Sequence, residues 1–171
     1  IEYLSDLVAI NSVNPNLSDQ GQGEKEIAQY IHSHFQSLGF NTSLFEVAKD
    51  RCNTTSFLSG NKSSKVLLMN GHIDTVGIED MDSPFILRQD GARLYGRGAY
   101  DMLAGCAIQM CLADFFAINE NPISLAFTFV CDEEDKSIGM DHLVSHFLPT
   151  LPTRPFLGIF LERTVDNIGI C

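Results

Sequence analysis

A short apolar run, Val66 to Met69, is the feature that most restricts how this chain can fold. Two serines stand shortly before the run and Gly71 follows it, which is the pattern of a strand buried on both faces. Two longer apolar runs, Ile123 to Cys131 and Phe156 to Leu161, predict a second and a third buried strand. The core is therefore expected to form around a covered β-sheet.

Helical patterns alternate with these strands. Apolar residues recur at steps of three and four between Ile27 and Leu38, which predicts a helix. Gly39 follows at the position where a helix commonly ends in a left-handed glycine cap. The cluster Asn11 to Pro15 should end a short helix at residues 4–8, because proline cannot continue a helix. We also expect a strand at residues 40–47, a helix at 103–116, and loops at 17–23 and 77–90. This alternation predicts an α/β fold with a largely parallel sheet, where ligands gather at the carboxyl ends of strands.

The composition excludes some partners. With 171 residues and 44% hydrophobic content, the chain is expected to form one domain. It has 11 Lys and Arg against 22 Asp and Glu, a net charge of −11, and no basic stripe, so nucleic acid is not an expected partner. No apolar run approaches the length of a membrane span, so no membrane is expected either.

The five cysteines are odd in number and include no C-x-x-C pair, which argues against a disulfide framework and a thiolate zinc site. They favour a reducing, cytoplasmic location. Their positions are Cys52, Cys106, Cys111, Cys131 and Cys171. The chain starts at Ile1 without an initiator Met or a signal-peptide pattern, so we interpret it as beginning inside a gene product.

His72 and Asp74 follow the first buried strand, and residues two apart in an extended chain face the same side. A carboxylate placed in this way can orient a metal-binding imidazole, because such histidines usually donate their second ring N–H to a partner. The spacing alone is common by chance. It indicates a metal site only in combination with further ligands.

A glycine-containing segment, Tyr95 to Met102, leads into the helix expected at 103–116. Gly96 and Gly98 let the backbone turn tightly just ahead of Asp101. Asp101 can be interpreted either as the N-cap of that helix or as a metal ligand. The segment lacks both the third glycine and the Gly-Lys-Ser/Thr sequence of phosphate-binding loops.

Adjacent carboxylates, Glu133 and Glu134, follow the second buried strand. Like charges near a low-dielectric core are costly unless a positive group such as a divalent metal compensates them. The alternative is an exposed acidic turn from Asp132 to Asp135. Glu162 follows the third strand, so these groups and His72 fall at one edge of the sheet. One neutral nitrogen with several hard oxygens suits zinc, cobalt or manganese in a two-metal cluster.

The ordered motifs resemble those of a metallopeptidase family that includes acetylornithine deacetylase, succinyl-diaminopimelate desuccinylase, aminoacylase and carboxypeptidase G. They are Gly71 to Asp74, Tyr95 to Met102, Asp132 to Glu134, and Leu161 to Thr164. The details around the first two are most similar to the acetylornithine-deacetylase-like branch. The resemblance implies a three-layer α/β/α fold of the di-zinc exopeptidase type, with a mixed, largely parallel sheet.

The same resemblance implies roles for six residues. Glu133 would be the general base, and Asp74 would be the partner that orients His72. The ligands would be His72 on one metal, Asp101 bridging both, Glu134 on the other metal, and Glu162 completing the shell of the metal held by His72. A cis peptide bond is expected between Asp101 and Met102.

The implied cofactors are two divalent metal ions, with Zn²⁺ expected and Co²⁺ or Mn²⁺ as alternatives. The implied reaction is hydrolysis of the amide bond of an N-acyl amino acid or short peptide by a two-metal-activated water.

The sequence departs from the family pattern in several places. The family's last metal-binding histidine lies near the carboxyl terminus of a much longer chain and has no counterpart here. Leu103 and Ala104 replace the usual Lys and Gly, and Arg163 replaces the usual Pro, where its charge should compete for the Glu162 carboxylate. The other histidines are expected on helices away from the site: His32, His34, His142 and His146.

The family's inserted second domain, which forms the lid and the dimer contacts, is also missing from this sequence. Residues 1–171 are therefore expected to be the incomplete N-terminal part of the catalytic, metal-binding domain, and a homodimer is considered only for the full-length protein. The leading hypothesis is an N-acyl amino acid hydrolase that is inactive as this fragment alone. The alternative is a truncated or non-catalytic relative that binds one metal or none.

Overall fold

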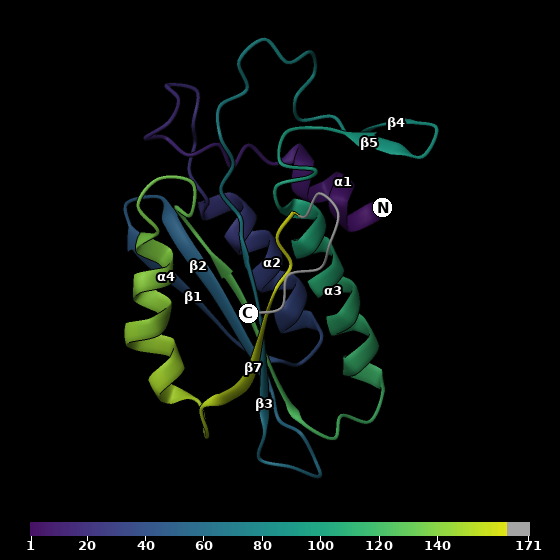
Figure 1. The fold of residues 1–171 in the computed structure, drawn as a ribbon, viewed down its shortest axis with the longest axis vertical. Coiled ribbons are helices and arrows are strands. Elements are labelled where there is room, and N and C mark those ends of the chain that lie inside the picture. The colour runs from purple at the N-terminus through teal and green to yellow at the C-terminus, as the bar shows by residue number, and fades with distance from the viewer. Residues whose placement is uncertain (164–171) are drawn as a thin grey trace.

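The computed structural model describes residues 1–163, which form one mixed five-stranded sheet with helices on both faces (Figure 1). The strands of this sheet lie in the order β1-β2-β6-β3-β7. Their bounds are β1 (Asn41–Ala48), β2 (Arg51–Leu58), β3 (Val66–His72), β6 (Ser124–Val130) and β7 (Pro155–Phe160). A separate two-stranded ribbon pairs β4 (Arg88–Asp90) with β5 (Arg93–Tyr95).

Residues 1–163 also form four α-helices. They are α1 (Glu2–Ala9), α2 (Lys25–Ser37), α3 (Leu103–Ile118) and α4 (Ile138–His142). The last of these continues through a π-helical turn (Leu143–Phe147) and a 3₁₀ turn (Leu148–Thr150). The glycine that follows α2, Gly39, adopts a φ of 80°, as its position at the end of the helical pattern predicts.

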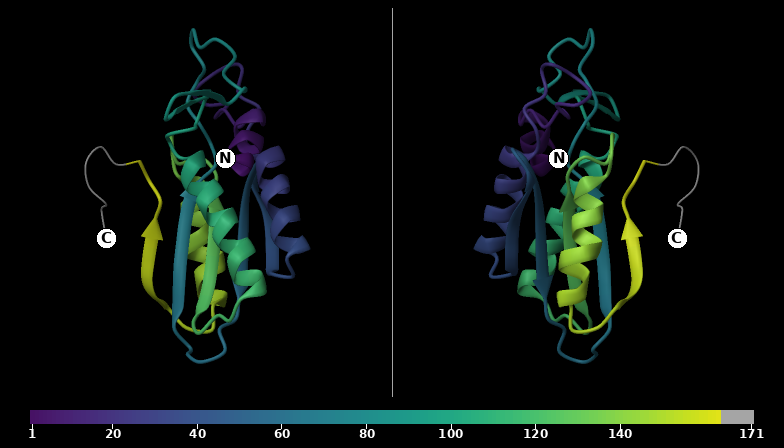
Figure 2. Two further views of the ribbon diagram at one scale, coloured as in Figure 1. Left: turned by 90° about the vertical axis from the view of Figure 1, so that its right-hand side faces the viewer. Right: turned by 90° about the vertical axis from the view of Figure 1, so that its left-hand side faces the viewer.

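The side chains of β6 alternate between two apolar cores. Leu125, Phe127 and Phe129 pack with α1, α2 and α3 on one face of the sheet, and the views of Figure 2 show these helices on that side. Ala126 and Val130 pack with the helical segment that begins at α4 on the other face. The three-layer α/β/α arrangement expected from the resemblance is confirmed.

The strand order determines which strand ends meet at one edge of the sheet. β3 lies between β6 and β7 and is parallel to both, so the carboxyl ends of these three strands meet at one edge of the sheet. β1 and β2, and β2 and β6, pair antiparallel, so two of the four pairings are parallel and the sheet is mixed. Residues that follow β3, β6 and β7 are therefore brought together although they are far apart in the sequence.

The structure corrects the sequence prediction in three places. β2 was not predicted, because its buried residues are mostly polar or charged. β4 falls in the region expected to be a loop at 77–90. β7 is an edge strand with exposed apolar side chains and is not buried on both faces, since only β3 pairs with it among the described residues.

Two sequence expectations involve residues outside the part of the chain that is described, namely Thr164 of the last motif and Cys171. The four described cysteines are free. No helix within residues 1–163 is long and apolar enough to span a membrane.

Candidate metal centre

His72 is the last residue of β3, and its side chain is almost completely buried. Its Nδ1 lies 2.9 Å from the backbone carbonyl oxygen of Asp74 and 3.5 Å from the Asp74 carboxylate. The sequence suggested the carboxylate as the orienting partner, and the carbonyl lies closer. Nδ1 faces these oxygens, so Nε2 is left to act as a ligand, and it faces the carboxylates of Asp101, Glu133 and Glu162.

Contacts from α3 fix the end of β3. The backbone N–H of His72 donates to Met102 Sδ at 3.1 Å, and the Cys106 thiol donates to the His72 carbonyl oxygen at 3.2 Å. Glycine at position 71 permits this close packing, since a Cβ there would lie 2.8 Å from Met102 Cε and would force that side chain to shift. The glycine before His72 therefore allows helix and strand to approach each other beneath the site.

Asp101 lies in the turn that enters α3, where Gly98 adopts a φ of 74°. The bond between Asp101 and Met102 is cis, as the resemblance predicted. The N-cap alternative for Asp101 is wrong: the N-cap residue of α3 is Met102, and no side chain caps the helix. The Asp101 carboxylate instead lies with its Oδ1 3.1 Å from His72 Nε2.

Asp74 joins two of the loops that form the site. Its side chain is fully buried, and its Oδ1 and Oδ2 accept the backbone N–H groups of Glu133 and Glu134 at 2.9 and 3.1 Å. Burial alone would raise the pKa of Asp74, but the neighbouring His72 and the N–H donors outweigh burial and lower it. The loop after β6 is thus held to the loop after β3 through one carboxylate.

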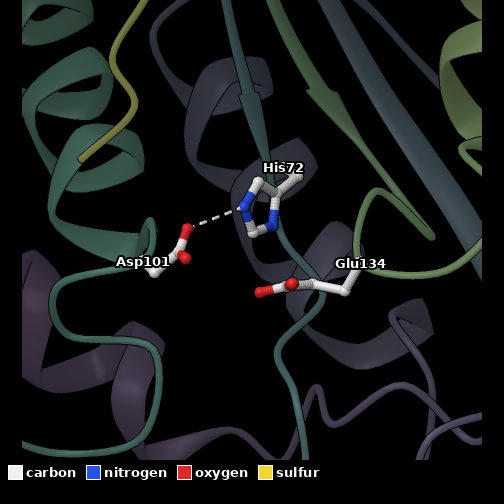
Figure 3. A group of neighbouring side chains, drawn as sticks. All are labelled: His72, Asp101 and Glu134. Carbon is white, nitrogen blue, oxygen red and sulfur yellow. Dashed lines mark hydrogen bonds and ion pairs between the residues drawn. The ribbon is translucent and has the colours of Figure 1, made fainter. Parts of the chain in front are cut away.

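The side chains that the sequence pointed to converge on one place. Ligand atoms of His72, Asp101 and Glu134 all lie within 4.8 Å of one another, and Figure 3 shows the three side chains reaching the same space from different elements. Glu133 Oε2 and Glu162 Oε1 lie 3.7 and 3.8 Å from His72 Nε2. A buried imidazole thus forms the floor of a site whose rim carries partly exposed carboxylates.

The electrostatics of this group favour a bound cation. Burial raises the pKa of Glu134 and of Glu162, and the Asp101 charge adds to the effect in both. Burial would lower the pKa of His72, but the surrounding carboxylates outweigh it and raise the pKa to about 10. Several carboxylates around one imidazole match the nitrogen and oxygen donors that zinc and related divalent ions prefer.

Arg163 reaches the centre in a different way from the one expected. Its Nε lies 2.9 Å from Asp101 Oδ2, so it pairs with Asp101 and not with the Glu162 carboxylate for which it was expected to compete. Together with Asp101, Glu134 and Arg97 it lines a cavity of about 280 Å³. One oxygen of Asp101 therefore faces His72 and the other faces a guanidinium.

Three residues near the centre were not identified from the sequence: Asn14, Glu24 and Arg51. They contact Asp132 or Asp74 from distant segments, and all three are buried. Only Asn14 belonged to a segment that had been singled out, the cluster that ends α1. The remaining histidines lie on helical segments elsewhere, as expected, and His142 and His146 stack on each other with ring centroids 4.4 Å apart.

Comparisons with known proteins identify the family and the fold of this chain. The chain is 25% identical over 167 residues to the acetylornithine deacetylase of Vibrio campbellii, covering 96% of this chain and 43% of that protein. It is 30% identical over 142 residues to N-formyl-4-amino-5-aminomethyl-2-methylpyrimidine deformylase of Halalkalibacterium halodurans, covering 78% of this chain and 33% of that protein.

A solved structure, that of human carnosine dipeptidase 1, shares the fold with a TM-score of 0.83 at 17% identity, covering 96% of this chain and 38% of that one. The chain thus spans well under half the length of these relatives. The family model described as Peptidase family M20/M25/M40 matches residues 68–170, which include His72, Asp101, Glu133, Glu134 and Glu162. On this evidence the chain belongs to peptidase family M20/M25/M40.

Proposed function

We propose that the protein hydrolyses the amide bond of N-acyl amino acids with the help of two divalent metal ions, zinc first among them. The observation that carries the proposal is the convergence of His72, Asp101 and Glu134, with Glu133 and Glu162 beside the imidazole. The names of the two sequence relatives support the reaction class, because deacetylation and deformylation both release an acyl group from nitrogen.

The proposed ligand roles are those that the family resemblance implies, and the positions of the donors support them. His72 Nε2 lies 3.1 Å from Asp101 Oδ1 and 3.8 Å from Glu162 Oε1, and Glu134 reaches the same space from the loop after β6. Asp101 is the proposed bridge between the two ions, His72 and Glu162 the ligands of one, and Glu134 the ligand of the other. When bound, such ions lower the pKa of a water molecule and polarise the amide carbonyl.

Glu133 is the proposed general base. Its side chain is about half exposed, and its carboxylate lies near His72 while its backbone is anchored by Asp74. A carboxylate that is free to reach water, but fixed at its main chain, can accept a proton from the attacking water and return it to the leaving amine. Asp74 takes no proton in this scheme and acts by holding His72 and the Glu133 loop.

Residues 1–171 are proposed to form the N-terminal part of a catalytic, metal-binding domain, with the complete reaction requiring the longer protein. A second candidate function is that of a non-catalytic relative that binds one metal or none. The pairing of Arg163 with Asp101 favours this alternative, because the guanidinium occupies the oxygen that a bridging ligand would offer to a second metal.

Metal analysis combined with an activity panel separates the two candidates. The full-length protein is expected to hold two equivalents of zinc and to release carboxylate from a panel of N-acetyl, N-succinyl and N-formyl amines. Glu133→Gln should keep the metal and lose activity by about 100-fold or more, since proton transfer contributes 10²–10⁴-fold. Substoichiometric zinc, together with no hydrolysis across the panel, would leave only the non-catalytic alternative.

A further inference from the structure

A buried polar network lies behind the candidate metal centre. It consists of Glu24, Arg51, Asp132, Asn14 and Asp74, all of them buried. Three of the five are carboxylates and one is a guanidinium. Charged groups are seldom buried without partners, so the arrangement of this network calls for a physical reason.

Arg51, the first residue of β2, bridges two of these carboxylates. Its Nε and one Nη donate to the two Glu24 oxygens at 2.5 and 2.7 Å, and the same Nη donates to Asp132 Oδ1 at 2.8 Å. A guanidinium presents its N–H groups in a fixed plane, so a pairing along two edges restricts where both partners can lie. Arg51 thus ties the start of α2 to the loop after β6.

Asp132 transmits this restraint to the glutamates of the candidate site. It has a φ of 63° and is the residue immediately before Glu133 and Glu134. Its backbone N–H donates to Glu24 at 3.2 Å, and its carbonyl oxygen accepts the N–H of Ser137. The main chain that presents the two glutamates is therefore fixed from Arg51 and Glu24 outward.

Asn14 closes the network toward His72. Its amide Nδ2 donates both to Asp132 Oδ1 at 2.9 Å and to Asp74 Oδ2 at 3.0 Å. Asp74 in turn accepts the N–H groups of Glu133 and Glu134. A continuous set of hydrogen bonds thus connects Arg51 with Asp74, which contacts His72, and through Asp74 with Glu133 and Glu134.

We propose that Arg51 is a positioning residue: by clamping Asp132 it sets where Glu133 and Glu134 stand relative to His72 and Asp101. The proposal rests on the proposed function, because it assigns Arg51 a role toward the metal ligand and the base named there. If the ion pairs of Arg51 only stabilised the fold, replacing Arg51 would change metal affinity and turnover no more than an equally destabilising substitution elsewhere.

The test compares three variants of the full-length protein. Arg51→Lys keeps a positive charge between Glu24 and Asp132 but removes the two-edged pairing. Arg154→Lys makes the same change at an exposed position outside the network. Leu143→Ala removes a buried apolar side chain that takes no part in the network and serves as a destabilised control with an intact network. Zinc affinity is measured by calorimetry, turnover by kcat and KM, and stability by Tm.

Arg51→Lys is expected to weaken zinc binding and to lower kcat, each by about 10- to 100-fold, with KM changed much less, as is usual when the partners of metal ligands are altered. Arg154→Lys should have the zinc affinity, kcat and Tm of the wild type. Leu143→Ala should have a lower Tm and an unchanged zinc affinity. If Arg51→Lys kept the zinc affinity and kcat of the wild type, the role proposed for Arg51 would be wrong, whereas the proposed function would stand. Equal losses in Leu143→Ala would also overturn the role proposed for Arg51, since stability would then explain them. A wild-type protein that binds no zinc would instead refute the proposed function, and the inference with it.

Discussion

At the scale of single residues, Arg163 competes with a metal for one oxygen of the candidate ligand Asp101. Its Nε faces the Asp101 oxygen that does not face His72, and its side chain is 60% exposed. An exposed cation that must leave before a metal can use this oxygen competes with the metal. The free energy needed to separate Arg163 from Asp101 is small, because exposed ion pairs contribute about 0–1 kcal/mol.

Arg163→Ala is therefore expected to bind zinc about two- to fivefold more tightly than the wild type, which is the factor that such a pair represents. Calorimetric titration of the full-length protein measures this change, with Arg163→Lys as the charge-preserving control. Weaker zinc binding in Arg163→Ala would mean that the guanidinium supports the ligand Asp101 and does not compete for it.

The site residues show which parts of a functional site a sequence can predict. The convergence of His72, Asp101, Glu133, Glu134 and Glu162 could be predicted, because each lies at the end of a recognisable strand or turn and strand ends meet at one edge, whereas their individual roles rest on the family resemblance. Arg51 and Glu24 could not be predicted, since their contacts join segments far apart in sequence and no local periodicity marks them. The contacts of these two residues form only when β2 and the start of α2 pack together.

At the scale of elements, the centre depends on the packing of α3 beneath the end of β3. The helices and the strands β3 and β6 could be predicted from apolar periodicity, whereas β2 could not, because polar groups such as Asn53 and Thr54 are buried there by hydrogen bonds. The contact between Gly71 and α3 likewise leaves no apolar signal. It is a steric requirement that follows from the fold.

Gly71→Ala is expected to destabilise the protein by about 1–3 kcal/mol, the usual cost of overpacking a core. The added Cβ would lie 2.8 Å from Met102 Cε and 3.0 Å from Gln109 Nε2. Urea unfolding measures the change. Gly158→Ala on β7 is the matched control, because its Cβ would meet nothing closer than the Phe160 ring at 3.3 Å, and its effect should stay within about 0.5 kcal/mol. Equal effects at the two positions would contradict the packing argument.

At the scale of the whole molecule, the described part of the chain leaves one apolar edge uncovered. Figure 2 shows β7 at the edge of the sheet. The side chains of Phe156, Ile159 and Phe160 on this strand are exposed, and so are those of Ile108 and Phe115 on α3. An exposed apolar edge strand favours pairing with other polypeptide. The chain spans 33% to 43% of the length of the sequence relatives, so further polypeptide in a longer protein is the expected cover.

Residues 1–171 expressed alone are therefore expected to self-associate and to bind a hydrophobic dye more strongly than the full-length protein. Analytical ultracentrifugation and dye fluorescence measure this. Phe156→Ser combined with Phe160→Ser should reduce both signals, whereas Tyr100→Ser, which removes an exposed aromatic side chain outside β7, should not. A monomeric fragment that binds no dye would contradict the view that this edge needs a cover.

The proposed function requires that His72, Asp101 and Glu134 together bind a divalent metal at the carboxyl edge of the sheet. Anomalous diffraction at the zinc edge from zinc-soaked crystals of the full-length protein tests it most directly. We expect a strong anomalous peak at about 2.0–2.2 Å from His72 Nε2 and from an Asp101 oxygen, with a second peak beside Glu134. Saturating zinc with no peak among these three side chains would contradict it.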